Sequence, residues 1–177
     1  MIWRSTIDLT DAERLALNIF AKQYEGSSEE AVPNALKQFP SVLEKINSLV
    51  DSYLPKKYKK YLVQSWAINL TKDTVIPYNP HNHGYSHFNF IFYTESDGEN
   101  CLVLRDANNL EFKLKLKTNE FIILPPQQIH MIDIGKAKSD RISFVGDVIL
   151  TETEYKSSMF LPPVNIWQEL ELSLIHI

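Results

Sequence analysis

The spacing of apolar residues changes near residue 60, and this change constrains the fold more than any other feature. Before it, apolar side chains recur every three or four residues, the repeat of an amphipathic helix. After it, they alternate with polar ones, the repeat of a strand with one buried face. The 177 residues fit one domain. We therefore expect a single domain with a helical layer at 1–60, a β core at 61–150 and a C-terminal extension at 151–177.

Two helices are predicted in the N-terminal layer. Thr10 and Glu13 have the spacing of a capping box, and apolar residues follow at helical spacing to about Tyr24. Pro40 begins a second amphipathic segment, which Pro55 ends. Each helix has one apolar stripe, so both are predicted to cover one face of a sheet.

The β core is predicted as short strands at 62–70, 87–94, 101–104, 111–117, 120–124 and 141–150. In the first strand, Leu62, Trp66, Ile68 and Leu70 are expected on one side. In the second, Phe88, Phe90 and Phe92 are expected on one face, opposite His87, Asn89, Ile91 and Tyr93. Short strands separated by turn residues are typical of a barrel or sandwich. The predicted fold class is mainly β: an antiparallel barrel or jelly roll with helices on one sheet.

Composition excludes several functions. A net charge of −4 argues against a general nucleic-acid binder. Cys101 is the single cysteine, so no internal disulfide forms and a reducing compartment is favoured. No apolar run approaches the ~18 residues of a membrane span, and the first residues lack a signal-peptide pattern. We expect a cytoplasmic protein without nucleic-acid or membrane partners. A homodimer is compatible with the sequence, which predicts no interface.

Three of the five histidines, His81, His83 and His87, lie in one short segment. On a strand, residues i and i+2 point to the same side about 7 Å apart, so His81 and His83 are predicted to bind one metal. His130 opens another strand after a proline turn and supplies a third ligand. Three ligands on one face leave coordination positions open, which suits non-haem iron. His87 is an alternative to His83 as a ligand, or a polar group lining the pocket.

A basic residue stands on the last predicted strand, where Arg141 and Ser143 share one face. A guanidinium can bind both oxygens of a carboxylate, so this pair is suited to holding an acid. Tyr93 and Asn89 share a face of the strand that follows the histidine pair, and are predicted to reach the same cavity. The plainer alternative for Arg141 is an ion pair with an acidic side chain at a strand end.

The order of these motifs resembles the 2-oxoglutarate- and Fe(II)-dependent oxygenases, in particular their small prolyl-hydroxylase-like members. The matching motifs are Ser65-Trp66, His81-x-His83, an aromatic strand ending at Tyr93, Leu104-Arg105-Asp106, Leu124-Pro125-x4-His130 and Arg141-x-Ser143. The resemblance covers roughly residues 60–150. It implies a double-stranded β-helix, the cupin-like form of the jelly roll.

The resemblance also implies a site. His81, His83 and His130 match the positions of the catalytic metal ligands and would hold Fe(II). Arg141 and Ser143 match the residues that bind the far carboxylate of 2-oxoglutarate, and Tyr93 is similar to a tyrosine that contacts it. The implied reaction hydroxylates a small-molecule or peptidyl substrate, with succinate and CO2 as co-products.

One residue departs from the pattern. His83 stands where the family usually has an acid, so the site also resembles the three-histidine sites of cupins. The alternatives are therefore a cupin-type metalloenzyme that does not use 2-oxoglutarate, such as a thiol dioxygenase or an isomerase, and a non-enzymatic cupin that binds a small ligand. Arg141 favours the oxygenase.

Overall fold

A computed structural model describes residues 2–54, 58–151 and 168–169. The predicted helix end at Pro55 and most of the C-terminal extension, with His176, lie outside the described residues. The helical segments are α1 (Asp11–Ala21), the 3-10 helix η1 (Ala35–Gln38) and α2 (Pro40–Tyr53). The strands are β1 (Trp3–Thr6), β2 (Gly26–Ser27), β3 (Lys59–Leu70), β4 (Val75–Ile76), β5 (Phe88–Glu95), β6 (Leu102–Arg105), β7 (Glu111–Leu114), β8 (Glu120–Leu124), β9 (Ile129–Ile132), β10 (Gly135–Lys136), β11 (Arg141–Thr151) and β12 (Gln168–Glu169).

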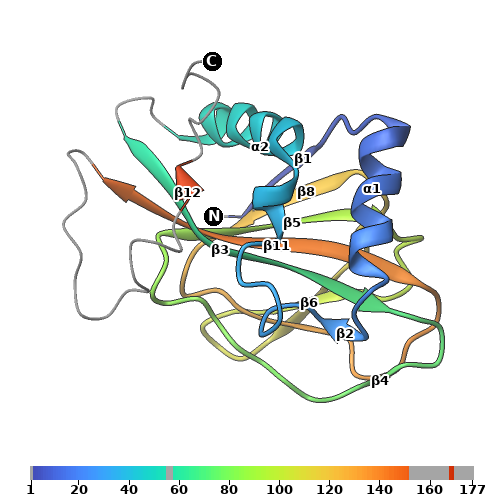
Figure 1. The fold of residues 1–177 in the computed structure, drawn as a ribbon. Helices are drawn as coiled ribbons and strands as arrows, with labels where there is room; N and C mark the ends of the chain where they lie inside the picture. Colours follow the sequence, from blue (N-terminus) through green and yellow to red (C-terminus); the bar gives the residue numbers. More distant parts are fainter. Residues whose placement is uncertain (1, 55–57, 152–167, 170–177) are drawn as a thin grey trace.

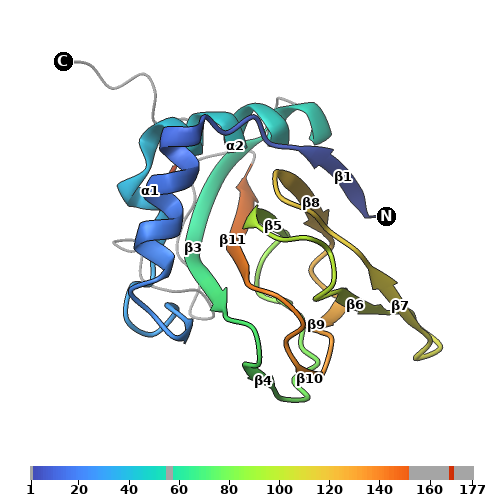
Figure 2. The same cartoon turned by 90° about the vertical axis from the view of Figure 1, so that its right-hand side faces the viewer.

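The strands form a jelly roll of antiparallel pairs. The larger sheet has the order β1-β8-β5-β11-β3-β12, with β2 also on β3, and the smaller sheet has the order β7-β6-β9. Strands β4 and β10 form a separate ribbon. Both helices lie on one side of the larger sheet and the smaller sheet on the other (Figures 1 and 2). The predicted fold class, a mainly β jelly roll with helices packed on one sheet, is confirmed.

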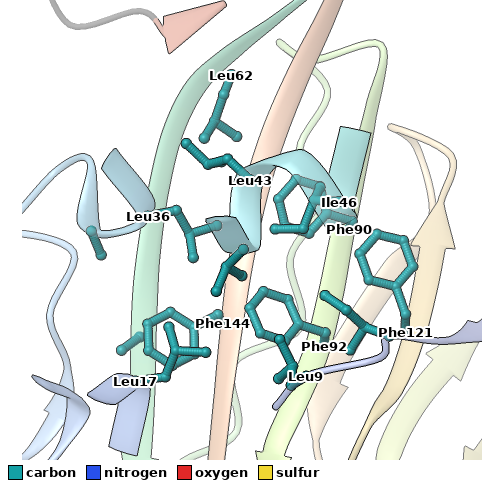
Figure 3. Packing of buried hydrophobic residues seen from close by; sticks show 14 of the residues in the cluster. Leu9, Leu17, Leu36, Leu43, Ile46, Leu62, Phe90, Phe92, Phe121 and Phe144 are labelled. Carbon is teal, nitrogen blue, oxygen red and sulfur yellow. The ribbon is translucent and has the colours of Figure 1, made fainter. Parts of the chain in front are cut away.

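The two faces of the larger sheet bury two different cores. The phenylalanines of β5 point toward the helices, where Phe90, Phe92 and Phe121 stack beside Leu36 and Ile46 (Figure 3). The opposite face lies inside the jelly roll, where the core includes Trp66, Ile91, Tyr93, Leu102, Leu104, Leu116, Ile122, Leu124 and Val145. The alternation predicted for the second strand is therefore confirmed, because it separates these two cores.

The prediction that Leu62 lies on the same side of its strand as Trp66 is wrong. The pairing of β11 with β3 shifts by one residue, so that Asp147 pairs with Gln64 and Val148 with Leu62. A bulge of this kind moves every residue beyond it to the other face. Leu62 therefore joins the helix-side core, whereas Trp66 keeps its place inside the jelly roll.

The sequence predicted a helical layer at residues 1–60, but this layer also contains two strands, β1 and β2. Strand β1 extends the larger sheet by pairing with β8, and Trp3 packs edge-on against Phe121 with ring centroids 6.2 Å apart. The predicted capping box is confirmed: Glu13 N–H donates to the Thr10 hydroxyl, and Thr10 N–H donates to the Glu13 carboxylate. No helix among the described residues is long and apolar enough to cross a membrane.

A glycine allows the helix-side core to close on β11. A Cβ placed on Gly146 would lie 2.2 Å from Phe90 Cζ and 2.9 Å from Leu62 Cδ1. No side chain fits at that distance, so Gly146 lets the Phe90 ring lie directly on the strand. This contact fixes the strand that carries Arg141 at its beginning.

Candidate metal centre

Three histidines from two segments meet inside the jelly roll. His81 and His130 pair in a single antiparallel bridge, with His81 N–H donating to the His130 carbonyl at 3.1 Å and His130 N–H to the His81 carbonyl at 2.9 Å. His83 lies two residues further, where its N–H donates to the Pro126 carbonyl at 3.1 Å. One ring nitrogen of each histidine lies within 4.8 Å of those of the other two. In the described part of the chain, no other group of three such side chains clusters in this way.

The backbone around the pair differs from the expectation. His81 and His83 were predicted on one strand, but His81 contributes only the isolated bridge and the chain turns directly after His83. Both side chains nevertheless offer a ring nitrogen to the same cluster. His130 lies on β9, the strand that follows the predicted proline turn.

Hydrogen bonds orient all three rings in the same sense. Nδ1 of His81 lies 2.9 Å from the Asn79 carbonyl, and Nδ1 of His130 lies 3.0 Å from the Gln128 carbonyl. Nδ1 of His83 lies 2.6 Å from an oxygen of Asp147. Since all three partners are acceptors, each Nδ1 carries the proton and each Nε2 keeps a free lone pair. Three free lone pairs at one point are the donor set of a metal site.

Burial differs among the three histidines and affects the titration of His130. His83 and His130 are buried, whereas His81 is exposed. Burial, helped by the neighbouring histidines, lowers the pKa of His130 to about 3. The Nε2 atom of His83 is buried without any hydrogen-bond partner. A buried ring nitrogen without a partner is free to bind a cation.

His87 does not belong to the centre. It is exposed, and its Nδ1 accepts a hydrogen bond from the Leu150 N–H at 3.2 Å. The turn after His83 points its side chain away, so the alternative of His87 as a ligand is wrong. It does not line the cavity either.

The three histidines open into a cavity of about 420 Å³. Its interior end carries Arg141 and Ser143, which share a face of β11 as predicted. Its remaining walls are mainly apolar and include Trp66, Ile68, Leu70, Val75, Ile76, Pro77, Ile91, Leu102, Met131, Ile132 and Val145. The cavity therefore joins the metal-binding nitrogens to a buried cation.

Arg141 is a buried cation with unused donors. The residue is only 1% exposed, and its Nη2 donates to the Tyr93 hydroxyl at 2.9 Å. Its Nε and Nη1 have no hydrogen-bond partner among the described residues, and neither does the hydroxyl of Ser143. The described residues therefore include no acidic partner that forms an ion pair with Arg141. A buried guanidinium with two nitrogens free to donate is matched to a bound anion.

The two predicted residues on β5 occupy different places. Tyr93 is buried and meets the site through its hydrogen bond to Arg141. Asn89 is also buried, but both polar atoms of its amide lack partners and it does not line the cavity. In the larger sheet, Asn89 stands opposite Asp147 on one side and Leu124 on the other.

One residue of the site was missed by the sequence analysis. Asp147 is fully buried on β11, the strand that begins with Arg141. The sequence did contain a sign of it. After Arg141, Asp147 is the single charged residue in a strand of otherwise uncharged residues. A buried acid of this kind needs a polar partner, and the partner, His83, lies 64 positions away.

No protein-family model and no curated protein matches this sequence. Solved structures do match. The epimerase SnoN in complex with Fe3+, alpha ketoglutarate and nogalamycin RO aligns with a TM-score of 0.64 at 7% identity, over 84% of this chain and 78% of that one. A prolyl-4-hydroxylase from Pseudomonas putida aligns with a TM-score of 0.56 at 10% identity, over 82% and 91% of the two chains.

A third match is HygX from Streptomyces hygroscopicus with nickel and 2-oxoglutarate bound, with a TM-score of 0.56 at 8% identity over 83% of this chain and 81% of that one. The first two are named for different reactions, yet all three share this architecture. The chain therefore has the fold of the 2-oxoglutarate- and Fe(II)-dependent oxygenases, as the resemblance had implied.

Proposed function

We propose that this protein is a non-haem Fe(II)- and 2-oxoglutarate-dependent oxygenase that hydroxylates its substrate. The observation that carries the proposal is the meeting of three oriented imidazoles and one unpaired buried guanidinium in a single cavity. The fold is that of proteins crystallised with iron or with 2-oxoglutarate, which supports the same reading.

The residues present fit both groups. The Nε2 of His83 and the two free nitrogens of Arg141 are buried polar atoms without partners, and leaving such atoms unsatisfied is costly. A metal on His81, His83 and His130 would satisfy the first. A dicarboxylate that reaches from this metal to Arg141 and Ser143 would satisfy the others.

Iron with 2-oxoglutarate supplies oxidising power from dioxygen, and the cosubstrate leaves as succinate and CO2. The chain contributes position and selectivity. The carbonyls of Asn79 and Gln128 hold two imidazoles in the ligating tautomer. Arg141 binds the distal carboxylate, and Tyr93 holds the guanidinium in place. The apolar walls exclude water from the reacting end.

The side chains that line the cavity limit the kinds of substrate that we propose. Between the histidines and the surface they are formed by apolar side chains of β3, β4 and β9, such as Ile68, Ile76 and Met131. Among the described residues that line the cavity, Glu29 has the one carboxylate and Arg141 the one guanidinium. We propose a small molecule or peptide segment that presents an apolar, uncharged portion to the metal. The proposed location is the cytoplasm, because the single cysteine indicates a reducing environment.

Succinate formation tests the proposal. Purified protein with Fe(II), ascorbate and 2-oxoglutarate is expected to release succinate slowly even without the true substrate, and His130→Ala is expected to release none. Glu111→Gln on the exposed β7 strand is the matched control, since it removes an exposed charge that does not line the cavity. Metal binding without any succinate or 2-oxoglutarate binding would refute it.

The three-histidine set specifically favours one other function. A cupin-type dioxygenase that binds its substrate directly to the metal needs no 2-oxoglutarate. Oxygen consumption that is independent of 2-oxoglutarate and persists in Arg141→Met would identify this alternative. The structural neighbours also include an epimerase and a carbocyclase, so product analysis must follow the succinate assay.

A further inference from the structure

Asp147 is the deepest acidic group near the metal centre. Its side chain is fully buried, and both of its oxygens are engaged. Oδ1 lies 2.6 Å from His83 Nδ1, and Oδ2 accepts a hydrogen bond from the Tyr85 hydroxyl at 2.5 Å. Neither partner is a lysine or arginine. Burying a carboxylate without a formal cation costs several kcal/mol, so its retention here calls for a role.

His83 is held more firmly than the other two histidines. Trp66 stacks on its ring with an interplanar angle of 3° and centroids 5.7 Å apart. Its backbone N–H is fixed by the Pro126 carbonyl. His81 and His130 use neutral carbonyls at Nδ1, whereas His83 uses a charged carboxylate. Asp147 therefore places a carboxylate directly behind His83, in hydrogen-bond contact with its ring.

We infer that Asp147 is a positioning residue that fixes His83 with Nε2 toward the metal and supplies the negative charge that the three neutral imidazoles lack. This inference rests on the proposed metal site. A carboxylate behind a ligating imidazole raises the basicity of the ligand, and removing such a partner typically weakens metal binding 10–100-fold. In the family pattern an acid at position 83 would bring a negative charge as a direct metal ligand. Here that charge would come from Asp147, which contacts the ligand His83 instead of the metal.

Tyr85 completes the arrangement. Its hydroxyl is part-buried and donates to Asp147 Oδ2, the oxygen that His83 does not use. The Tyr85 hydroxyl in turn accepts from Gln64 Nε2 at 3.3 Å, and the same Nε2 donates to Glu29 at 3.1 Å. This chain of contacts restrains the carboxylate from the side opposite His83.

Cobalt titration of the metal-free protein tests the inference, with visible absorption as the readout. Asp147→Asn keeps the size and an acceptor oxygen but removes the charge, and is expected to weaken Co(II) binding about 10–100-fold. Tyr85→Phe keeps the carboxylate and removes only the hydrogen bond that the hydroxyl donates to it, so it is expected to weaken Co(II) binding less than Asp147→Asn does. Glu111→Gln removes an equal charge from the surface and is expected to change nothing.

The outcomes separate the inference from the proposed function. If the wild type does not bind Co(II), or His130→Ala binds it equally well, the metal site itself is wrong. If the wild type binds, His130→Ala does not, and folded Asp147→Asn binds within about twofold of the wild type, only the role of Asp147 is refuted. Circular dichroism establishes which variants fold.

A measurement on the unaltered chain decides the matter if Asp147→Asn does not fold. Nitrogen-15 NMR of the histidine rings, with and without Zn(II), reports which nitrogen carries the proton. His83 is expected to keep a strongly downfield Nδ1 proton in both states, while its Nε2 resonance shifts on binding zinc. An Nδ1 resonance that loses its proton or binds the zinc would overturn the inference.

Discussion

Replacing Arg141 by methionine separates cosubstrate binding from metal binding. In the structure, Nε and Nη1 are buried and free, and these two nitrogens would donate to the distal carboxylate. A hydrogen bond from a charged donor contributes about 1.5–3 kcal/mol, so the pair contributes about 3 kcal/mol or more. Because ~1.4 kcal/mol is a factor of ten, 2-oxoglutarate should bind at least about 100-fold more weakly.

Thermal unfolding with saturating Mn(II) under anaerobic conditions measures this loss. At a 2-oxoglutarate concentration of 100 times the wild-type Kd, the wild type gains about 2.7 kcal/mol, whereas a variant weakened about 100-fold gains about 0.4 kcal/mol. For a chain of this size, the wild type should shift by roughly 5–11 °C and the variant by about 1 °C.

The same experiment has two internal controls. Without 2-oxoglutarate, Arg141→Met should unfold at the wild-type temperature or above, because it removes a buried cation with two unpaired donors. Tyr93→Phe keeps the guanidinium and loses one contact, so it should retain most of the shift. A full ligand-induced shift in Arg141→Met would refute the assignment of Arg141, and so would loss of Mn(II) binding.

Three further outcomes follow from the packing and electrostatics. Gly146→Ala should lower the free energy of unfolding by about 1–3 kcal/mol in urea titration, because Phe90 occupies the space of the new methyl group; an unchanged midpoint would contradict the close contact. Thr10→Ala should cost about 1 kcal/mol by the same measurement, since the cap of α1 is lost, and Asp8→Ala just outside the cap is the comparison. In the metal-free protein, the pKa of His130 is lowered by burial to about 3 from 6.5. Between these two pKa values the unfolded state binds one proton more than the folded state. The free energy of unfolding should therefore fall by about 1.4 kcal/mol for each pH unit below 6.5, and His130→Gln should flatten this slope.

The sequence indicated the jelly roll because its signals are local. Alternation in β5 separated the helix-side phenylalanines from the inner face, and that separation is what the two cores show. The error at Leu62 came from a bulge between β3 and β11. A bulge depends on two paired strands, and neither strand alone carries a sign of it.

The candidate site, like the fold, has features that local sequence patterns predict and features that they do not. The spacing of His81 and His83, the proline turn before His130 and the shared face of Arg141 and Ser143 are local patterns, and the structure brings these residues into one cavity. Which histidine would be left out was decided by the turn after His83, which directs His87 toward the Leu150 backbone instead.

The sequence by itself determined the kind of fold and the residue types that meet in the cavity, since hydrophobic period and motif spacing are properties of short segments. Only the tertiary structure placed Asp147 behind His83 and left two nitrogens of Arg141 without partners. Both facts depend on strands that are distant in the chain and adjacent in the sheet. Burial and pairing arise between segments, so a hydrogen bond spanning 64 positions is decided by the register of β11.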